Sequence, residues 1–530
     1  MKKSLRTISL CLVLAMIVVF SGCGKKQEQT SSNVKVNETG MPIVNEKITL
    51  KVMGSKGPLQ GPWDQLYVFE AMEKMTNIHL EFDTPPSQNY QEKKNIMFAS
   101  GEYPDVFFGG LLTSQDEVMY GEQGILVPLE GYIDTYAPNL KKIFEKYPDV
   151  KKSITTMDGH IYALPYVGDV NWELTTKLWI NQKWMDKVGK TMPTNVDELY
   201  DLLIAFKEQD ANGNGKNDEI PLSFDNSVFS VIRPGLMSFF GIIATDLKVD
   251  VTDHSKVRYY PASENYKEYL KFMNKLNREG LIDPEAFIQT NQQVAAKGNE
   301  NRIGLFANAA AMLTVGTALQ EDYVALSPLT SSVSTTPVWP KKSAVTRGTF
   351  AITKENKYPE ATMRWVDTFY SEEGGIFLLD GDENVSWRYL DDTKEKWERI
   401  MPEGEFKSTE EFRGGKISPA AGTPLPAYMT TEWRKKLNAA HVPILVKEVQ
   451  EKYEPYMKFE YPQTYFTQEE QKKLSSLEAD LTKYVEQMEV AFITGDPSFA
   501  NWDEYIKTLE KMGYKEVQDI YQVAYDRWEK

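Results

Sequence analysis

Residues 48–52 read ITLKV and residues 78–82 read IHLEF, and these two segments decide the fold. Apolar and polar side chains alternate in both, as they do in a half-buried β-strand. Between them, from Trp63 to Thr76, apolar residues recur at helical spacing, with Pro62 at the start. A strand, a helix and a second strand predict a βαβ unit with parallel strands and a right-handed crossover.

The rest of the chain continues this mixture of strands and helices, which predicts an α/β fold. Thr467 and Glu470 have the spacing of a capping box at the start of a long helix, whose apolar stripe stops near Gly495. Two further helices are expected at 502–512 and from 517 to the end. Other strands are expected at 161–164, 176–180, 303–306 and 349–353, and other helices at 92–99, 196–207 and 266–277.

Composition argues against several classes of protein. The 530 residues, 41% of them hydrophobic, are enough for a sizeable core and more than one domain. The net charge of -16 argues against nonspecific nucleic-acid binding and electrostatic attachment to a membrane. Both cysteines, Cys11 and Cys23, lie in the first 23 residues, which excludes a disulfide scaffold. The sequence contains no HExxH, GxSxG or Walker A motif, and its four histidines are scattered.

The first 23 residues have the pattern of an export signal. A basic start precedes an apolar run from Ile8 to Phe20, which is too short to span a bilayer comfortably. Residues 20–23 read FSGC and resemble the bacterial lipobox, in which the cysteine becomes the lipidated first residue. We expect residues 1–22 to be a lipoprotein signal peptide, Cys23 to carry the lipid (palmitate), and residues 23–45 to form a flexible tether. The alternative is an ordinary secretory signal in which the cysteine is incidental.

Residues 210–219 read DANGNGKNDE, which is the most specific motif of the chain. Oxygen-bearing side chains at the first, third, fifth and ninth positions, with glycine at the sixth, match the front of an EF-hand loop. Pro221 at the twelfth position excludes strict EF-hand geometry, but Glu219 could close the shell. We expect a structural Ca²⁺, because a full shell leaves no place for a water nucleophile; the alternative is a surface turn. The expected ligands are Asp210, Asn212, Asn214, the Lys216 carbonyl, Asp218 and Glu219.

Several further segments resemble one family of transport proteins. They are GEYPD at 101–105, DGHIYALP at 158–165, LWINQKW at 178–184, FITG at 492–495 and YDRW at 525–528. With the lipobox, they look like the lipoprotein solute-binding subunits of bacterial carbohydrate ABC importers, extracellular solute-binding protein family 1. The 210–219 loop is similar to the calcium loop of the alginate-oligosaccharide-binding members, which have glutamate at the place of Glu219.

This resemblance implies a two-lobed periplasmic-binding-protein-like fold of type II, with a hinge and extra C-terminal helices. Lobe 1 would hold residues 46–166 and 346–395, and lobe 2 would hold residues 167–345 and 396–530. The protein would be a monomer, lipid-anchored on the extracellular face of the cell membrane. It would not be an enzyme: it would capture an oligosaccharide in the cleft between the lobes and deliver it to the membrane permease.

Sugars present flat C–H faces and a rim of hydroxyl groups, so their receptors need exposed aromatic rings with polar groups nearby. We looked for tryptophans in loops, since those on periodic apolar faces belong to the core. The ligand-binding candidates are Trp172, Trp339, Trp387 and Trp63, with Asp105, Tyr166, Arg347 and Glu383 as polar partners. Trp179, Trp184, Trp365 and Trp502 are assigned to the core.

Two other functions stay open at the level of sequence. A secreted polysaccharide-active enzyme would line its groove with similar aromatic residues, and its paired carboxylates have no sequence signature. A peptide receptor could share the fold, because fold alone does not determine the ligand.

Overall fold

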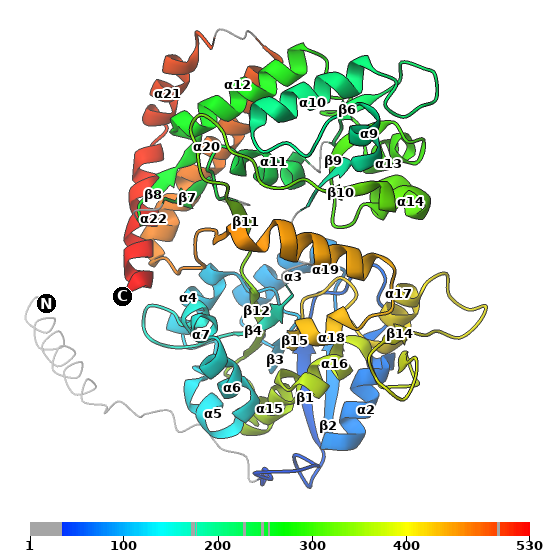
Figure 1. The fold of residues 1–530 in the computed structure, drawn as a ribbon. Helices are drawn as coiled ribbons and strands as arrows, with labels where there is room; N and C mark the ends of the chain where they lie inside the picture. The colour runs from blue at the N-terminus through cyan, green and yellow to red at the C-terminus, as the bar shows by residue number, and fades with distance from the viewer. Residues whose placement is uncertain are drawn as a thin grey trace, which may run out of the picture.

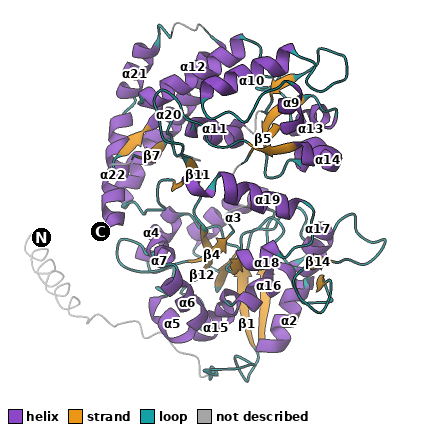
Figure 2. Ribbon diagram, in the orientation of Figure 1, coloured by secondary structure: helices purple, strands orange, loops and turns teal. Residues whose placement is uncertain are grey.

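The computed structural model describes residues 34–530, except residues 171–174, 176, 226–228, 245–247, 253–254 and 496–498. The expected lipidation site Cys23 and the first-ranked ligand candidate Trp172 lie outside the described residues. The chain forms two lobes, one above the other in Figure 1, and both mix helices with strands (Figure 2). Within the described part of the chain, no helix has the length and apolar character needed to cross a membrane.

Lobe 1 begins with the βαβ unit that the sequence predicts. Strands β1 (Ile48–Met53) and β2 (Ile78–Asp83) pair in parallel, with Ile48 opposite Ile78. Helix α2 (Tyr67–Thr76) connects them, after the short turn η1 (Trp63–Gln65). The alternation in β1 places Leu50 and its apolar neighbours in the core and the polar residues on the surface, so the predicted unit is confirmed.

The lobe 1 sheet has six strands in the order β15-β4-β12-β3-β1-β2. The four strands added to the βαβ unit are β3 (Val106–Phe108), β4 (Leu164–Asp169), β12 (Val345–Ile352) and β15 (Tyr428–Thr430). The accompanying elements are α3 (Ser87–Ser100), α4 (Ser114–Glu122), α5 (Glu130–Tyr136), α6 (Pro138–Lys146), α7 (Pro148–Ile154), α15 (Pro359–Asp367), η4 (Thr368–Tyr370), α16 (Glu372–Asp380), α17 (Thr409–Phe412) and η5 (Arg413–Ile417).

The sheet corrects part of the lobe boundaries expected from the sequence. Residues 396–530 were assigned to lobe 2, but β15 pairs with β4 in the lobe 1 sheet. Phe412, Ile417 and Leu425 are also buried in the lobe 1 core. The returning part of lobe 1 therefore continues to Thr430, because this segment completes the edge of the sheet. Strand β4 also differs from the expected range: it runs through the proposed boundary at residue 166 to Asp169.

Lobe 2 is built on a four-stranded sheet in the order β10-β5-β9-β6. Its strands are β5 (Leu178–Asn181), β6 (Ile220–Leu222), β9 (Ile303–Ala307) and β10 (Tyr323–Ala325). The surrounding elements are α9 (Gln182–Lys187), α10 (Val196–Glu208), α11 (Phe229–Ser238), the hairpin β7 (Val249–Val251) and β8 (Val257–Tyr259), η2 (Tyr260–Ala262), α12 (Glu264–Arg278), α13 (Asn291–Asn299), α14 (Met312–Leu319) and η3 (Gln320–Asp322).

The C-terminal helices pack on lobe 2. In α20 (Gln468–Thr494) the predicted capping box between Thr467 and Glu470 is present, and the predicted stripe is buried through Leu474 and Leu481. Asn274 of α12 donates to the Phe492 carbonyl at 2.8 Å, close to the end of α20. The other elements of this part are α18 (Thr431–Lys435), α19 (His441–Lys452), η6 (Glu454–Tyr456), β16 (Met457–Phe459), α21 (Trp502–Lys511) and α22 (Tyr514–Glu529).

Among the described elements, the chain passes between the lobes three times: from β4 to β5, from β11 (Trp339–Lys341) to β12, and from β15 to α19. At the second passage β11 pairs in parallel with β16. The half-buried Tyr166 packs against the cores of both lobes. These passages form the hinge region.

Part of the expected tether is docked on lobe 1. Ile43 and Val44 are fully buried, and Val44 forms a bridge with Val36. Arg364 of α15 donates hydrogen bonds to the carbonyls of Asn37 and Gly40. The expectation of a flexible tether as far as residue 45 is therefore wrong from residue 34 onward, because this stretch contributes apolar side chains to the core.

Candidate functional site

In open α/β sheets a ligand is expected at the carboxyl ends of the parallel strands. In lobe 1, β1 and β3 end at Met53 and Phe108, and in lobe 2, β6 and β9 end at Leu222 and Ala307. Helices α3 and α14, which follow β2 and β9, lie on the sides of the lobes that face each other (Figure 1). These facing sides are the candidate ligand site.

The sequence analysis missed two polar residues at these strand ends. Asp225, soon after β6, is 1% exposed and accepts a hydrogen bond from Asn291 at 3.1 Å. Asn308, directly after β9, donates to Thr314 at 3.0 Å, while its carbonyl accepts from the indole of Trp179. The position after a buried strand is the signal that would have found them.

Two of the tryptophans chosen from the sequence are core residues in the described structure. Trp63 is 1% exposed; it donates to the Gln60 side chain at 2.9 Å, and it lies so close beneath Gly54 that an added Cβ would collide with its ring. Trp339 is fully buried and stacks on Tyr453 with ring centroids 4.2 Å apart. The expectation that these side chains avoid the core is wrong: Trp63 lies in η1 and packs against Phe69 of α2, and Trp339 lies in strand β11 under Tyr453.

Trp387 belongs to an aromatic group formed by a hairpin and α18. The hairpin consists of β13 (Trp387–Tyr389) and β14 (Trp397–Arg399). Trp433 of α18 stacks on Trp397 at 4.5 Å and meets Trp387 edge-on at 4.7 Å. Trp387 is 7% exposed, so it too is a core residue rather than an open platform.

The edge of this aromatic group is polar. The half-buried ring of Tyr389 meets Trp387 edge-on at 5.3 Å. Burial, and then the charges of Glu383 and Glu372, raise the pKa of Tyr389. Glu383 itself is exposed. The structure therefore brings together Trp387 and Glu383, two candidates from the sequence, beside a tyrosine that the sequence analysis did not single out.

The other polar candidates lie apart from one another. Asp105 precedes β3, at the end opposite the strand carboxyl ends, and accepts from the Lys51 amide at 2.7 Å. Burial raises its pKa. Tyr166 lies in the hinge region, in register with Thr346 of β12.

Arg347 is half-buried and lies in a polar contact between lobe 1 and the segment before α20. Its guanidinium donates to the carbonyls of Ser153, Gln463 and Thr464 at 3.3 to 3.4 Å, and it lies 4.4 Å from the ring centroid of Tyr465. Sequence spacing gave no signal for this arrangement, because its members are far apart in the chain.

Glu117 of α4 is the acidic member of the same contact. It is 0% exposed, and its Oε2 accepts from the Tyr465 hydroxyl at 2.5 Å. Burial raises its pKa from 4.5 to about 7, against the opposing influence of Arg347 and of the hydrogen bond from Tyr465. A carboxyl group thus lies between the lobes in a site where its charged form is disfavoured.

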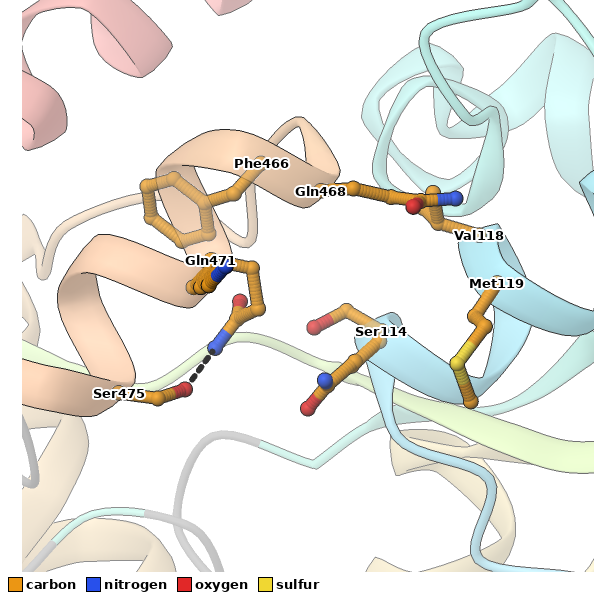
Figure 3. A pocket seen from close by; sticks show the side chains of 9 residues that line it. Ser114, Val118, Met119, Phe466, Gln468, Gln471 and Ser475 are labelled. Atoms are coloured by element: carbon orange, nitrogen blue, oxygen red, sulfur yellow. Dashed lines mark hydrogen bonds between the residues drawn. The ribbon is translucent and has the colours of Figure 1, made fainter.

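A cavity of about 350 Å³ lies beside this contact, between α4 and the start of α20 (Figure 3). Figure 3 shows polar side chains from both helices directed into it. Its lining residues are Ser114, Gln115, Val118, Met119, Phe466, Gln468, Gln471, Lys472 and Ser475.

The 210–219 loop closes on itself through its own side chains. The Gly215 amide donates to both carboxylate oxygens of Asp210, at 3.2 and 3.3 Å, and the Asn214 amide donates to the side-chain oxygen of Asn212 at 3.0 Å. The side-chain amides of Asn212 and Asn214 both donate to Asp218 Oδ1. Burial opposes the charge of Asp218, but these bonds hold its pKa below the usual value.

The donor atoms of this loop decide whether it suits a cation. No three His, Cys, Asp or Glu side chains gather as possible metal ligands anywhere in the described chain. The loop nevertheless supplies amide oxygens besides its carboxylates, and Glu219 Oε2 is buried without a hydrogen-bond partner among the described residues. Lys187 and Arg302 lie 3.6 and 3.7 Å from carboxylate oxygens of the loop and partly neutralise them. An unpartnered buried oxygen beside the carboxylates fits a hard cation.

Comparison with known proteins identifies the family. Residues 56–228 match the bacterial extracellular solute-binding protein family. The chain is 30% identical to the fructooligosaccharide ABC transporter substrate-binding protein FusA of Streptococcus pneumoniae, over 98% of each chain. The chain therefore belongs to the bacterial extracellular solute-binding proteins, which confirms the resemblance and the fold class expected from the sequence.

Two solved structures extend this comparison. FusA in complex with kestose has a TM-score of 0.72 and 29% identity, and the alignment covers 91% of this chain and 99% of FusA. The alginate-binding protein AlgQ2, in a structure described as without calcium ion, has a TM-score of 0.68 and 25% identity, covering 91% of this chain and 98% of AlgQ2. A further FusA structure is described as an EF-hand mutant.

Proposed function

We propose that this protein captures an oligosaccharide between its two lobes and delivers it to the permease of an ABC importer. The observation that carries the proposal is the similarity to FusA along 98% of both chains, since FusA is named for fructooligosaccharides. The strand ends of two lobes that face each other across a hinge suit a ligand enclosed by closure.

A neutral saccharide, with fructooligosaccharides as the leading class, fits this chain better than an acidic one. The net charge of -16 would repel a polyuronate unless cations intervened. Glu383 and the Tyr389 hydroxyl offer hydrogen-bond partners suited to sugar hydroxyl groups. We propose Glu383, Tyr166 and Trp172 as the ligand-binding candidates retained from the sequence, with Asn308 and Tyr389 added from the structure.

The proposal includes an anchored receptor. Cys23 in the sequence FSGC would carry a lipid, which would hold a monomer on the extracellular face of the membrane near its permease. It also includes a structural Ca²⁺ held by the 210–219 loop. The unpartnered Glu219 Oε2 supports the ion, and so does the description of a FusA structure as an EF-hand mutant.

Isothermal titration calorimetry tests the proposed ligand. The panel contains kestose and longer fructooligosaccharides, alginate oligosaccharides and peptides of similar mass. We expect micromolar or tighter affinity for at least one neutral oligosaccharide, about -8 kcal/mol or better. Binding of peptide alone would replace the saccharide proposal with a peptide receptor. Release of reducing sugar from any glycan in the panel would support the polysaccharide-active enzyme.

A further inference from the structure

The segment from Tyr461 to Gln468, which precedes α20, contacts both lobes. On the side of lobe 2 it is held by α22: the Tyr461 hydroxyl donates to the Tyr521 carbonyl at 2.7 Å, and Phe466 meets the Tyr521 ring edge-on at 5.1 Å. We call residues 461–468 the bridging segment. It continues directly into α20, whose buried face belongs to the lobe 2 core, so this end moves with lobe 2.

On the side of lobe 1 the bridging segment is held by α4 and β12. Tyr465 donates to the buried Glu117 at 2.5 Å, and its ring lies against the Arg347 guanidinium. Gln463 donates to the Val345 carbonyl at 2.9 Å. The segment therefore adds a noncovalent tie to the three passages of the chain between the lobes.

The bond between Tyr465 and Glu117 is costly to break. Tyr465 is 5% exposed and Glu117 is fully buried, so neither group has ready access to water as a replacement partner. Glu117 Oε1 already lacks a hydrogen-bond partner among the described residues, and losing the tyrosine hydroxyl would leave the whole carboxyl group without its side-chain donor. A buried polar group in that condition carries a large free-energy penalty.

The surroundings of this bond leave room for movement. The cavity of about 350 Å³ separates the side chains of α4 and α20 immediately beside it (Figure 3). The open space between the two helices would allow the lobes to rotate about the contact at Tyr465. A buried contact next to an open space has the geometry of a pivot.

We propose that Tyr465, bonded to Glu117, is a positioning residue that confines the relative motion of the lobes and thereby strengthens ligand binding. The inference rests on the proposed function. Without this tie the ligand-free protein would sample more relative lobe orientations, and a smaller fraction would be competent to close on a ligand. Apparent affinity falls in proportion to that fraction.

The test compares two conservative substitutions in the whole chain. Tyr465→Phe removes only the hydroxyl that donates to Glu117. Tyr505→Phe is the matched control, because this buried hydroxyl donates to the Pro261 carbonyl at 3.2 Å within lobe 2. We expect Tyr465→Phe to weaken oligosaccharide binding about tenfold, the effect of one buried hydrogen bond. Tyr505→Phe should lower Tm without changing Kd.

A second variant, Glu117→Met, removes the acceptor instead of the donor. We expect a similar loss of affinity, and a double variant no weaker than the single variants, since both remove the same bond. Equal Kd values for Tyr465→Phe and Tyr505→Phe would overturn the proposal, and so would additive losses in the double variant.

Hydrogen–deuterium exchange separates this proposal from the proposed function, because it needs no ligand. We expect faster exchange in α4 and in the bridging segment for Tyr465→Phe, with no such change for Tyr505→Phe. If the unsubstituted protein bound none of the saccharides but exchange followed this pattern, the function would be wrong and the lobe tie would stand. Unchanged exchange in α4 would contradict the tie itself.

Discussion

The 210–219 loop and the bridging segment 461–468 are both short polar stretches, but their hydrogen bonds reach very different distances along the chain. Within the loop, Asn212 bonds to Asp218 and to Glu219, at separations of six and seven residues. The bridging segment bonds to Glu117 across 348 residues and to Val345 across 118. The chemistry of the loop can be read from residue spacing, whereas that of the segment depends on the assembled lobes.

The two regions should therefore contribute to the stability of the protein in different ways. A local loop can close on itself, and a bound cation would mainly fix its own residues. The bridging segment orders distant parts of the chain, so its loss should affect both the folding equilibrium and the relation between the lobes. Three substitutions test this contrast, and a fourth tests the ligand site, which belongs to neither region.

The largest effect is expected for Arg347→Ala. This change removes the donor to three carbonyl groups and the cation that lies over the Tyr465 ring. We expect the free energy of unfolding to fall by about 3 kcal/mol or more, because three hydrogen bonds from a charged donor are lost at once. Urea denaturation measures it. Arg388→Ala, in an exposed pair with Glu398, is the control and should cost under about 1 kcal/mol. A loss of ligand affinity with unchanged stability would instead make Arg347 a ligand contact, as the sequence analysis supposed.

The next effect concerns the pH dependence that Glu117 imposes. Because burial raises its pKa from 4.5 to about 7, its protonated form is favoured in the folded protein. Its contribution to stability is therefore complete below about pH 4.5 and is lost as the pH rises through 7, a change of roughly 3 kcal/mol. Glutamine cannot ionise, so we expect the stability of Glu117→Gln to show no such fall as the pH rises.

The measurement is Tm between pH 4.5 and 8 for both proteins. Subtracting one Tm curve from the other removes the contributions of groups that titrate in both proteins. Asp367 is one such group, since burial raises its pKa to about 6. Parallel curves would show that Glu117 does not titrate in this range.

A somewhat smaller effect is expected from chelation at the 210–219 loop. If the loop holds Ca²⁺, an ion concentration of about 100 times Kd would stabilise the folded protein by about 2.7 kcal/mol, so EDTA should lower Tm measurably. Asp210→Ala should abolish the response to EDTA. Asn217→Ala is the matched control, since this exposed residue stands at the eighth position, outside the expected ligand set. A response to EDTA that survives Asp210→Ala would place the cation elsewhere.

The smallest effect is expected at the exposed edge of the aromatic group. Glu383→Ala should raise Kd for the bound oligosaccharide about fivefold, the effect of one hydrogen bond to a charged group near solvent, and should leave Tm unchanged. Glu395→Ala, an exposed acid in the same hairpin region, should change neither quantity. Calorimetric titration at one ionic strength compares the two. Equal Kd values would remove Glu383 from the ligand site.

The sequence predicted regular elements well where a single periodic pattern spans the whole element. The βαβ unit and the capped helix α20 are examples, since both depend on contacts between near neighbours. Strand β12 shows the limit: it was expected at 349–353 but begins at Val345, with a register shift between Thr346 and Phe350. Gly348 marks this irregularity: its φ is 68°, and an added Cβ would collide with the Leu112 carbonyl. It interrupts the alternation of apolar and polar residues by which a strand is recognised in a sequence.

The tryptophans show the same limit at the candidate site. Trp63 and Trp339 were chosen because their sequence neighbours are Gly, Pro and polar residues, which suggests an exposed loop. Their actual neighbours are Phe69 and Tyr453, stacked at 5.8 and 4.2 Å. Local composition predicted neither the backbone, since Trp339 lies in strand β11 and Trp63 in η1, nor the side chains that cover these residues.

The sequence by itself determined the family, the α/β class and the spacing of oxygen atoms in the 210–219 loop. These properties depend on residues within a few turns or strands of one another. Only the tertiary structure decided which aromatic side chains are buried, where lobe 1 ends, and that Glu117 meets Tyr465. The physical reason is that burial and pairing of polar groups are set by surfaces brought together from distant parts of the chain, and no local pattern records the partner.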